Sequence, residues 1–151
     1  MTTTSLRIVG VLLAAAVAAP LFLASARPAP VHDGANEKIE HAMEDLNGSL
    51  KRLEKALAEK DPAKCLPLVL KMQVACQDSK VEEPSMAATI ADAQKKAEFL
   101  LGYRKTMVEL QKQLLDLEVA ILDGKWEDAA KLVAEKVKPS KKAGHDAYKP
   151  E

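Results

Sequence analysis

Apolar side chains recur with the period of an α-helix in two long segments of the chain. In each segment, six apolar positions follow one another at steps of four and three residues, which places them on one face of a helix. The first series is Ile39, Met43, Leu46, Leu50, Leu53 and Leu57, and the second is Tyr103, Met107, Leu110, Leu114, Leu117 and Ile121. The pattern predicts one helix over residues 36–59 and a longer helix over residues 86–122, each with a buried stripe.

Two further helices are predicted beside these. Asp61 can cap a helix that has Pro62 in its first position and extends to Lys80, although Pro67, one turn later, favours a later start. Its apolar positions are Leu66, Val69, Met72 and Cys76. The Asp-Gly turn in "LDGKW" ends the long helix and returns the chain antiparallel into a helix from about Trp126. That helix presents Trp126, Ala130, Val133 and Val137 on one face.

No segment shows the sustained alternation of a β-strand. Four amphipathic helices with short connections predict an all-α fold, an antiparallel up-down-up-down four-helix bundle. Aromatic residues make up only 3% of the chain, so the core must be aliphatic or must be completed by a bound group.

The N-terminus has the layout of a secretory signal peptide. Arg7 is followed by an uncharged run from Ile8 to Ala24, and "ASA" places small residues before Arg27. Residues 1–26 are therefore expected to be a cleaved signal peptide, and residues 27–151 a single exported bundle in the periplasm. A retained membrane anchor is the alternative, because the run is just long enough to span a bilayer. After cleavage no membrane contact is expected.

Charge and cysteine content exclude several classes of protein. Without Arg7, the remaining 21 basic residues face 22 acidic ones, and no basic stripe stands out, which argues against a nucleic-acid partner. Cys65 and Cys76 are expected on one helix, about 16 Å apart, too far for a disulfide. They are interpreted as buried, reduced side chains. The chain contains no CxxCH motif, so covalent haem attachment is excluded.

Met43 and His145 are the candidate site. Met43 lies on the buried stripe of the first helix, and His145 extends the line Val133, Val137, Lys141 if the last helix continues. In an antiparallel bundle of four, the start of the first helix and the end of the last lie at the same end. A thioether facing an imidazole is the axial ligand pair of some electron-transfer cytochromes. Taken singly, such a methionine is usually core filler and such a histidine usually solvated.

Four stretches resemble the cytochrome b562 family in order along residues 37–149. They are "IEHAMEDLNGSLKRLEKAL", "LKMQVACQDSK", "YRKTMVELQKQLLDLEVAILDGKWEDAAKL" and "GHDAYK". In the first, Met43 precedes a Leu-Asn pair by three residues, as the family's ligand methionine does. In the last, His145 is followed after two residues by an aromatic side chain, as the family's ligand histidine is.

The resemblance implies one non-covalent haem b per chain, with Met43 and His145 as the axial ligands of a six-coordinate iron. It places Tyr103 at the porphyrin edge, followed by Arg104, and Met107 in the pocket wall. Lys141 and Lys149 fall near basic positions that could pair with the haem propionates, although solvated lysines are the more common case. The implied function is electron transfer with an unidentified redox partner protein, and not an enzyme activity.

One interval departs from the family pattern. Between Gly124 and His145 the chain has one residue more, and Pro139 lies inside this interval. A proline there removes a helical hydrogen bond, so the helix is expected to kink or end near "KPSK". His145 then either re-enters the pocket after the bend or is displaced from it.

Two other readings stay open from the residues alone. A haem-free exported bundle could act as a binding or stress-related module, with Met43 as filler and His145 in solvent. A di-metal bundle is less consistent with the sequence, because Glu40, His41 and Glu44 have no counterpart on a second helix.

Overall fold

The computed structural model describes residues 33–148 and contains only helices and turns there. The first hairpin joins α1 (Asp33–Glu59) to α2 (Pro62–Lys80). The short α3 (Met86–Thr89) leads into the long α4 (Ala93–Leu122). The last rod of the bundle consists of α5 (Trp126–Leu132), a π-helical turn η1 (Val133–Val137) and α6 (Lys138–Tyr148). The expected signal peptide, residues 1–26, and Lys149 lie outside the described residues.

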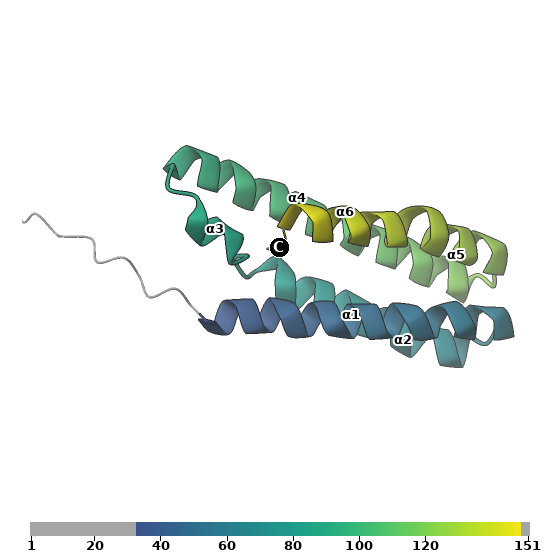
Figure 1. Ribbon diagram of the computed structural model, residues 1–151. Coiled ribbons are helices and arrows are strands. Elements are labelled where there is room, and N and C mark those ends of the chain that lie inside the picture. The colour runs from purple at the N-terminus through teal and green to yellow at the C-terminus, as the bar shows by residue number, and fades with distance from the viewer. Residues whose placement is uncertain (1–32, 149–151) are drawn as a thin grey trace, which may run out of the picture. The chain divides into compact units, whose positions relative to one another are not determined.

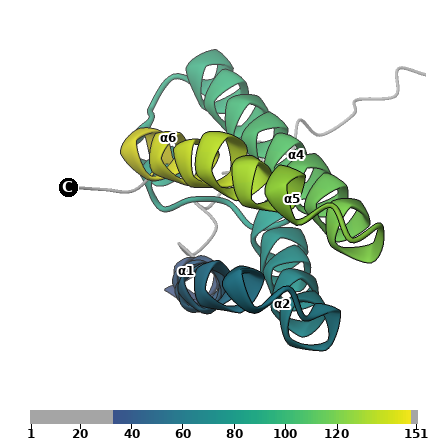
Figure 2. The ribbon, with the colours of Figure 1, turned by 90° about the vertical axis from the view of Figure 1, so that its right-hand side faces the viewer.

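The helices form the predicted antiparallel bundle (Figures 1 and 2). α1 packs against α2, α2 against α4, and α4 against α5 and α6, while α5 returns to α1 and closes the ring. The ends of α1 and α4 therefore lie at one end of the bundle with the starts of α2 and α5. The start of α1 and the end of α6 lie at the other. Among the described helices, none is both long and apolar enough to cross a membrane.

Local chemistry explains the corner between α1 and α2. Lys60 adopts a left-handed backbone (φ 52°) that ends α1, and the Asp61 carboxylate accepts a hydrogen bond from the Ala63 amide at 2.9 Å. Pro62 occupies the first position of α2, where no amide donor is needed. The later start suggested by Pro67 is wrong. Because Pro67 and Ala63, the residue four before it, are both exposed, water can satisfy the carbonyl that loses its donor.

The single long helix predicted over residues 86–122 is divided in two. Ile90 is extended (φ −88°, ψ 104°), and the Asp92 carboxylate accepts a hydrogen bond from the Lys95 amide at 2.8 Å to start α4. The Asp92 cap competes with continuation of the helix and interrupts the predicted helix at residues 90–92. At the other end, Gly124 takes a left-handed backbone (φ 69°) and turns the chain into α5, as predicted.

Both predicted stripes lie inside the bundle. Ten of their twelve side chains are buried, and Ile39 and Met43 are half-buried against the same core cluster. Cys65 and Cys76 are buried and reduced, as predicted. The Cys76 Sγ–H donates to the Met107 backbone carbonyl at 3.2 Å, which joins α2 to α4.

The helix does not end or bend away at "KPSK", contrary to expectation. The π-helical turn Val133–Val137 immediately precedes Pro139, and its last hydrogen bond runs from the Lys138 amide to the Val133 carbonyl. A π turn accommodates one more residue than an α-helical turn. It therefore absorbs the extra residue of this interval, and α6 continues as a regular helix through Pro139 to Tyr148.

Candidate functional site

Two polar contacts fix how α6 lies along α1. Lys138 forms an ion pair with Glu54, and one turn further on Lys141 donates a hydrogen bond to the Asn47 side chain. Because the helices are antiparallel, each step forward on α6 matches a step backward on α1. Four residues beyond Lys141 is His145, and four residues before Asn47 is Met43. The Asn47–Lys141 contact thus places His145 level with Met43, and the Glu54–Lys138 contact places it level with Asn47, so the two candidate ligands lie within about one turn of each other along the bundle.

The surroundings of the two side chains differ. Met43 is half-buried and packs against the hydrophobic core. The His145 side chain is 58% exposed, and its Nδ1 lies 3.9 Å from the Asp146 carboxylate. At that distance Nδ1 and the carboxylate are near neighbours without a direct hydrogen bond. The imidazole thus keeps both ring nitrogens available to a ligand.

Three aromatic rings hold the end of α6 against α4. The Tyr148 ring packs edge-to-face on Phe99 and on Tyr103, with ring centres 5.3 and 5.2 Å apart. Its hydroxyl lies 3.4 Å from Thr106 Oγ1 and close over Gly102, where an added Cβ would be 3.1 Å from it. A side chain at position 102 would therefore displace the Tyr148 hydroxyl by a few tenths of an ångström. The aromatic contact sets the position of the last turn of α6, in which His145 lies.

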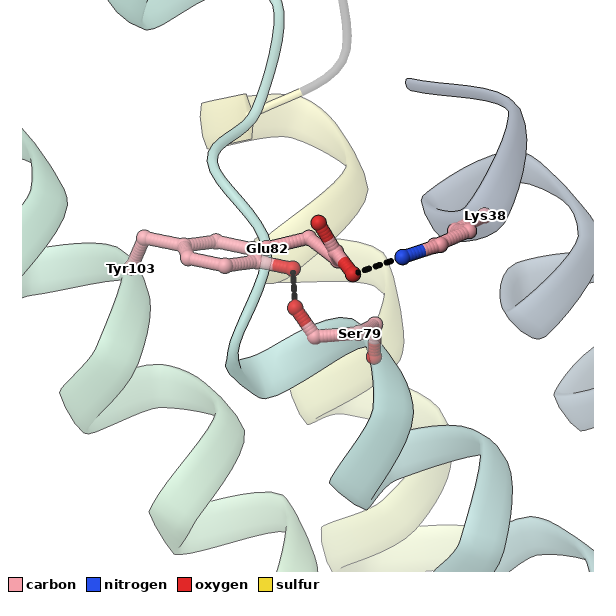
Figure 3. A network of polar contacts seen from close by, with 4 residues as sticks. All are labelled: Lys38, Ser79, Glu82 and Tyr103. Atoms are coloured by element: carbon pink, nitrogen blue, oxygen red, sulfur yellow. Dashed lines mark hydrogen bonds and ion pairs between the residues drawn. The ribbon is translucent and has the colours of Figure 1, made fainter. Parts of the chain in front are cut away.

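Tyr103 ties this aromatic cluster to α2. Its hydroxyl donates to the Ser79 backbone carbonyl at 2.8 Å, at the C-terminal end of α2 (Figure 3). Burial raises the pKa of the Tyr103 hydroxyl to about 12. The neighbouring ion pair, Lys38 to Glu82 at 2.9 Å, joins the start of α1 to the residues after α2. The sequence indicated Tyr103 as a site residue, but nothing local indicated Ser79 as its partner.

The other predicted site residues fall in different settings. Met107 is buried one turn beyond Tyr103, on the core face of α4. Arg104 is exposed. Lys141 is half-buried, and its pKa is lowered by desolvation and by Lys51 and Lys138. The Lys141 ammonium already has Asn47 as a partner, so it acts in the contact between α1 and α6.

Sequence reasoning missed Asn47, Phe99 and Tyr148 as members of the site. Phe99 and Tyr103 are four residues apart on α4, which is the one local signal that could have indicated an aromatic pair. Tyr148 was recognised only as part of a motif with His145. Its packing depends on the α4–α6 contact, which no local pattern encodes.

The donor set fits a haem iron. α1 and α6 supply one thioether and one imidazole within about one turn of each other, with the thioether packed against the apolar core, and Met/His ligation is typical of electron-transfer cytochromes. A polynuclear or di-metal site does not fit, since no group of three or more His, Cys, Asp or Glu side chains comes together within residues 33–148. Glu40, His41 and Glu44 do not form such a group.

Comparison with known proteins identifies the family of the chain. No curated protein matches the chain. Residues 38–149 match the family model described as Cytochrome b562, which covers the helical bundle to the end of α6 except for the first five residues of α1. This chain belongs to the cytochrome b562 family.

Proposed function

We propose that the chain is an electron-transfer protein that binds one haem b non-covalently between α1 and α6, with Met43 Sδ and His145 Nε2 as axial ligands. The observation that supports the proposal is that the Glu54–Lys138 and Asn47–Lys141 contacts bring His145 within about one turn of Met43 along the bundle. Membership of the cytochrome b562 family supports the choice of group.

Each residue then has a defined part in binding. Met43 presents its sulfur from a wall that is already apolar, so little polar surface has to be desolvated there. Asp146 lies near Nδ1 of His145 and can orient the ring so that Nε2 is directed to the iron. Tyr103 and Met107 line the α4 side, held by Ser79 and Cys76 respectively. For Arg104 and Lys149 we propose contact with the propionates, whereas Lys141 keeps its contact with Asn47.

The haem supplies a one-electron redox couple. Because the chain contributes both axial ligands, no position is left for a substrate, and the function is electron transfer without an enzyme activity. A thioether ligand raises the reduction potential relative to two imidazoles. The redox partner is proposed to be a protein that docks transiently near the end of the bundle where His145 lies.

Absorption spectroscopy tests the ligands. The purified protein is titrated with haemin and reduced with dithionite, and sharp low-spin α and β bands are expected. Met43→Leu and His145→Ala should abolish these bands, whereas Met72→Leu and His41→Ala should retain them. The controls match the tests in type, because Met72 is a core methionine on α2 and His41 an exposed histidine on α1.

A broad spectrum of loosely bound haem, unchanged by Met43→Leu and His145→Ala, would contradict the ligand assignment. The haem-free binding or stress-related module would then be the better reading. Loss of the bands in the control variants as well would indicate a general loss of the fold.

Export is proposed on the sequence alone. Arg7, the uncharged run Ile8–Ala24 and the small residues before Arg27 support a signal peptide that delivers the bundle to the periplasm. The intact mass of the protein recovered from the periplasm should correspond to a chain that begins at Arg27. A protein that stays in the membrane with residues 1–26 attached would overturn this.

A further inference from the structure

A groove of about 480 Å³ lies between the first half of α1 and the second half of α2, including the residues that follow α2. Met43 and His145, in contrast, lie on α1 and α6. Two buried alanines, Ala42 of α1 and Ala75 of α2, form part of the groove lining. Because their side chains are short, the two helices leave space here that longer side chains would fill. The groove is therefore a candidate binding site that the proposed haem site does not use.

Two large apolar side chains line this groove and yet face solvent. Val74 lies on α2 and Val81 at its C-terminal cap, and they are 52% and 59% exposed. Together with the two alanines they provide a surface on which an apolar group can be removed from water. A cavity of about 150 Å³ holds one benzene ring, so the groove has room for roughly two fused rings with a short side chain. The apolar part of an occupant is thus of small-molecule size.

Two ion pairs join α1 to α2 within the lining of the groove. Lys38 pairs with Glu82 at 2.9 Å (Figure 3), and Lys71 pairs with Asp45 at 2.8 Å. The hydrogen bond to Glu82 raises the pKa of Lys38, and the hydrogen bond from Lys71 lowers the pKa of Asp45. Both pairs therefore remain charged at neutral pH, and within each pair the two charges cancel. Lys38 and Asp45 are seven positions apart on α1, so the two pairs enclose a length of about 10 Å.

The charges of the lining do not cancel completely. Asp78 also lines the groove, and it has no ion-pair partner within residues 33–148. With the His41 imidazole neutral, the lining carries two ammonium groups and three carboxylates, which leaves a net charge of −1. The uncompensated carboxylate attracts a cation and repels an anion. The groove thus combines an apolar surface with one negative charge.

We propose that this groove binds a small amphiphilic amine, with its apolar body on Val74 and Val81 and its ammonium group paired with Asp78. Such a ligand matches the lining in size, in apolar surface and in charge. It covers the two exposed valines and supplies the carboxylate with a partner. The proposal concerns a second site, separate from the one between α1 and α6.

An NMR titration with tryptamine tests the site on the protein, expressed from its complete coding sequence and purified as the cell leaves it. At pH 8 the amine is protonated, whereas an imidazole is neutral. We expect saturable shifts of the amide signals of residues 38–45 and 71–82, with a dissociation constant on the order of 1 mM. Shifts concentrated on α6 instead, or no saturation by about 10 mM, would overturn the proposal.

The charge of the ligand is tested with indole-3-propionate. This compound has the same ring system as tryptamine and carries a carboxylate in place of the ammonium group. It should bind at least tenfold more weakly, because the lining has a net negative charge. Equal affinity for the two compounds would show that the groove does not select a cation and would contradict the proposal.

A matched pair of variants tests the role of Asp78. Asp78→Asn should weaken tryptamine binding at least fivefold, because it removes the uncompensated carboxylate. Asp116→Asn removes the same charge from an exposed position of α4 outside the groove, and should leave the affinity unchanged. Unchanged affinity in Asp78→Asn, or an equal loss in both variants, would overturn the assignment. Both variants retain Met43 and His145, so this site can fail while the haem proposal stands.

Discussion

The Tyr103 hydroxyl and the Cys76 thiol are buried hydrogen-bond donors in the contact between α2 and α4. Burial raises the pKa of the Tyr103 hydroxyl to about 12 and that of the Cys76 thiol to about 11, from ordinary values of 10.0 and 9.0. Tyr103, on α4, donates a hydrogen bond to the Ser79 backbone carbonyl of α2, and Cys76, on α2, donates one to the Met107 backbone carbonyl of α4. Ionisation of either group removes a donor and places a charge in the core.

The haem-free protein should therefore lose stability at alkaline pH. Both raised pKa values mean that the unfolded chain loses these protons first, so the free energy of unfolding falls as pH rises. The loss from Cys76 occurs between about pH 9 and 11, and the loss from Tyr103 between about pH 10 and 12, each on the order of 2 kcal/mol. Urea unfolding at a series of pH values measures this. Cys76→Ala should delay the decrease to about pH 10, and an unchanged onset would contradict the assignment.

At the scale of single residues, the sequence identified the candidate site residues better than the side-chain contacts between helices. Met43 and His145 could be named from the pattern and the family resemblance. The Asn47–Lys141 hydrogen bond that aligns them could not, because it joins residues that are far apart in the chain and depends on how two helices pack. The same holds for Tyr148, whose two ring contacts arise only when α6 lies against α4.

At the scale of elements, the π-helical turn is the feature that keeps Lys138 and Lys141 on the side of the last rod that faces α1. An extra residue in a regular helix would rotate all later side chains by about 100°. In this chain Val137 remains buried before the proline, and both Lys138, directly before the proline, and Lys141, two residues after it, reach α1. The wide turn thus takes up the extra residue before the site begins.

Deletion of Glu135, an exposed residue inside the π turn, should convert it to a regular α-helical turn and leave haem binding within a few-fold of the original affinity. Deletion of Lys142, which lies between the Lys141 contact and His145, should rotate His145 by about 100° and lower the affinity at least tenfold. Haemin titration measures both. Equal loss of affinity in the two deletions would show that the π turn does not serve this alignment.

Three of the four predicted rods were close to the observed elements, since periodicity and the Asp61–Pro62 and Asp-Gly signals define their ends. The break before α4 was missed because Met86–Leu122 reads as one helical pattern. Asp92 competes with that pattern by capping α4, and its effect depends on a balance between a cap and helix continuation. The effect of Pro139 was misjudged for a related reason, because a π turn has no clear sequence signal.

At the scale of the whole molecule, the bundle is closed at the end where α5 meets α1 and relies on fewer contacts where α6 ends. At the first end Ala129 is buried and Trp126 packs against the core, beside a groove of about 360 Å³ lined by Leu57 and Trp126. At the other end α6 has no buried residue. The aromatic cluster with Tyr148 provides the main apolar attachment there. Stabilisation by a ligand should therefore be greatest at this second end.

Haemin should raise the thermal stability of the protein. Free haemin at a hundredfold excess over its dissociation constant stabilises the folded state by about 2.7 kcal/mol, which corresponds to several degrees in the melting temperature. Differential scanning calorimetry of the protein with and without haemin measures this shift. Met43→Leu should remove most of the shift, and Met72→Leu should retain it. A shift of equal size in both variants would indicate binding elsewhere.

The two buried thiols allow local opening of the bundle to be measured separately at each of its ends. A thiol reacts with a labelling reagent only when the surrounding structure opens and the thiolate forms. Cys65 lies in the first turn of α2, at the closed end, and Cys76 lies against Met107, next to the candidate site. The rates at which the two residues are labelled therefore report separately on how often each end of the bundle opens, without any added probe.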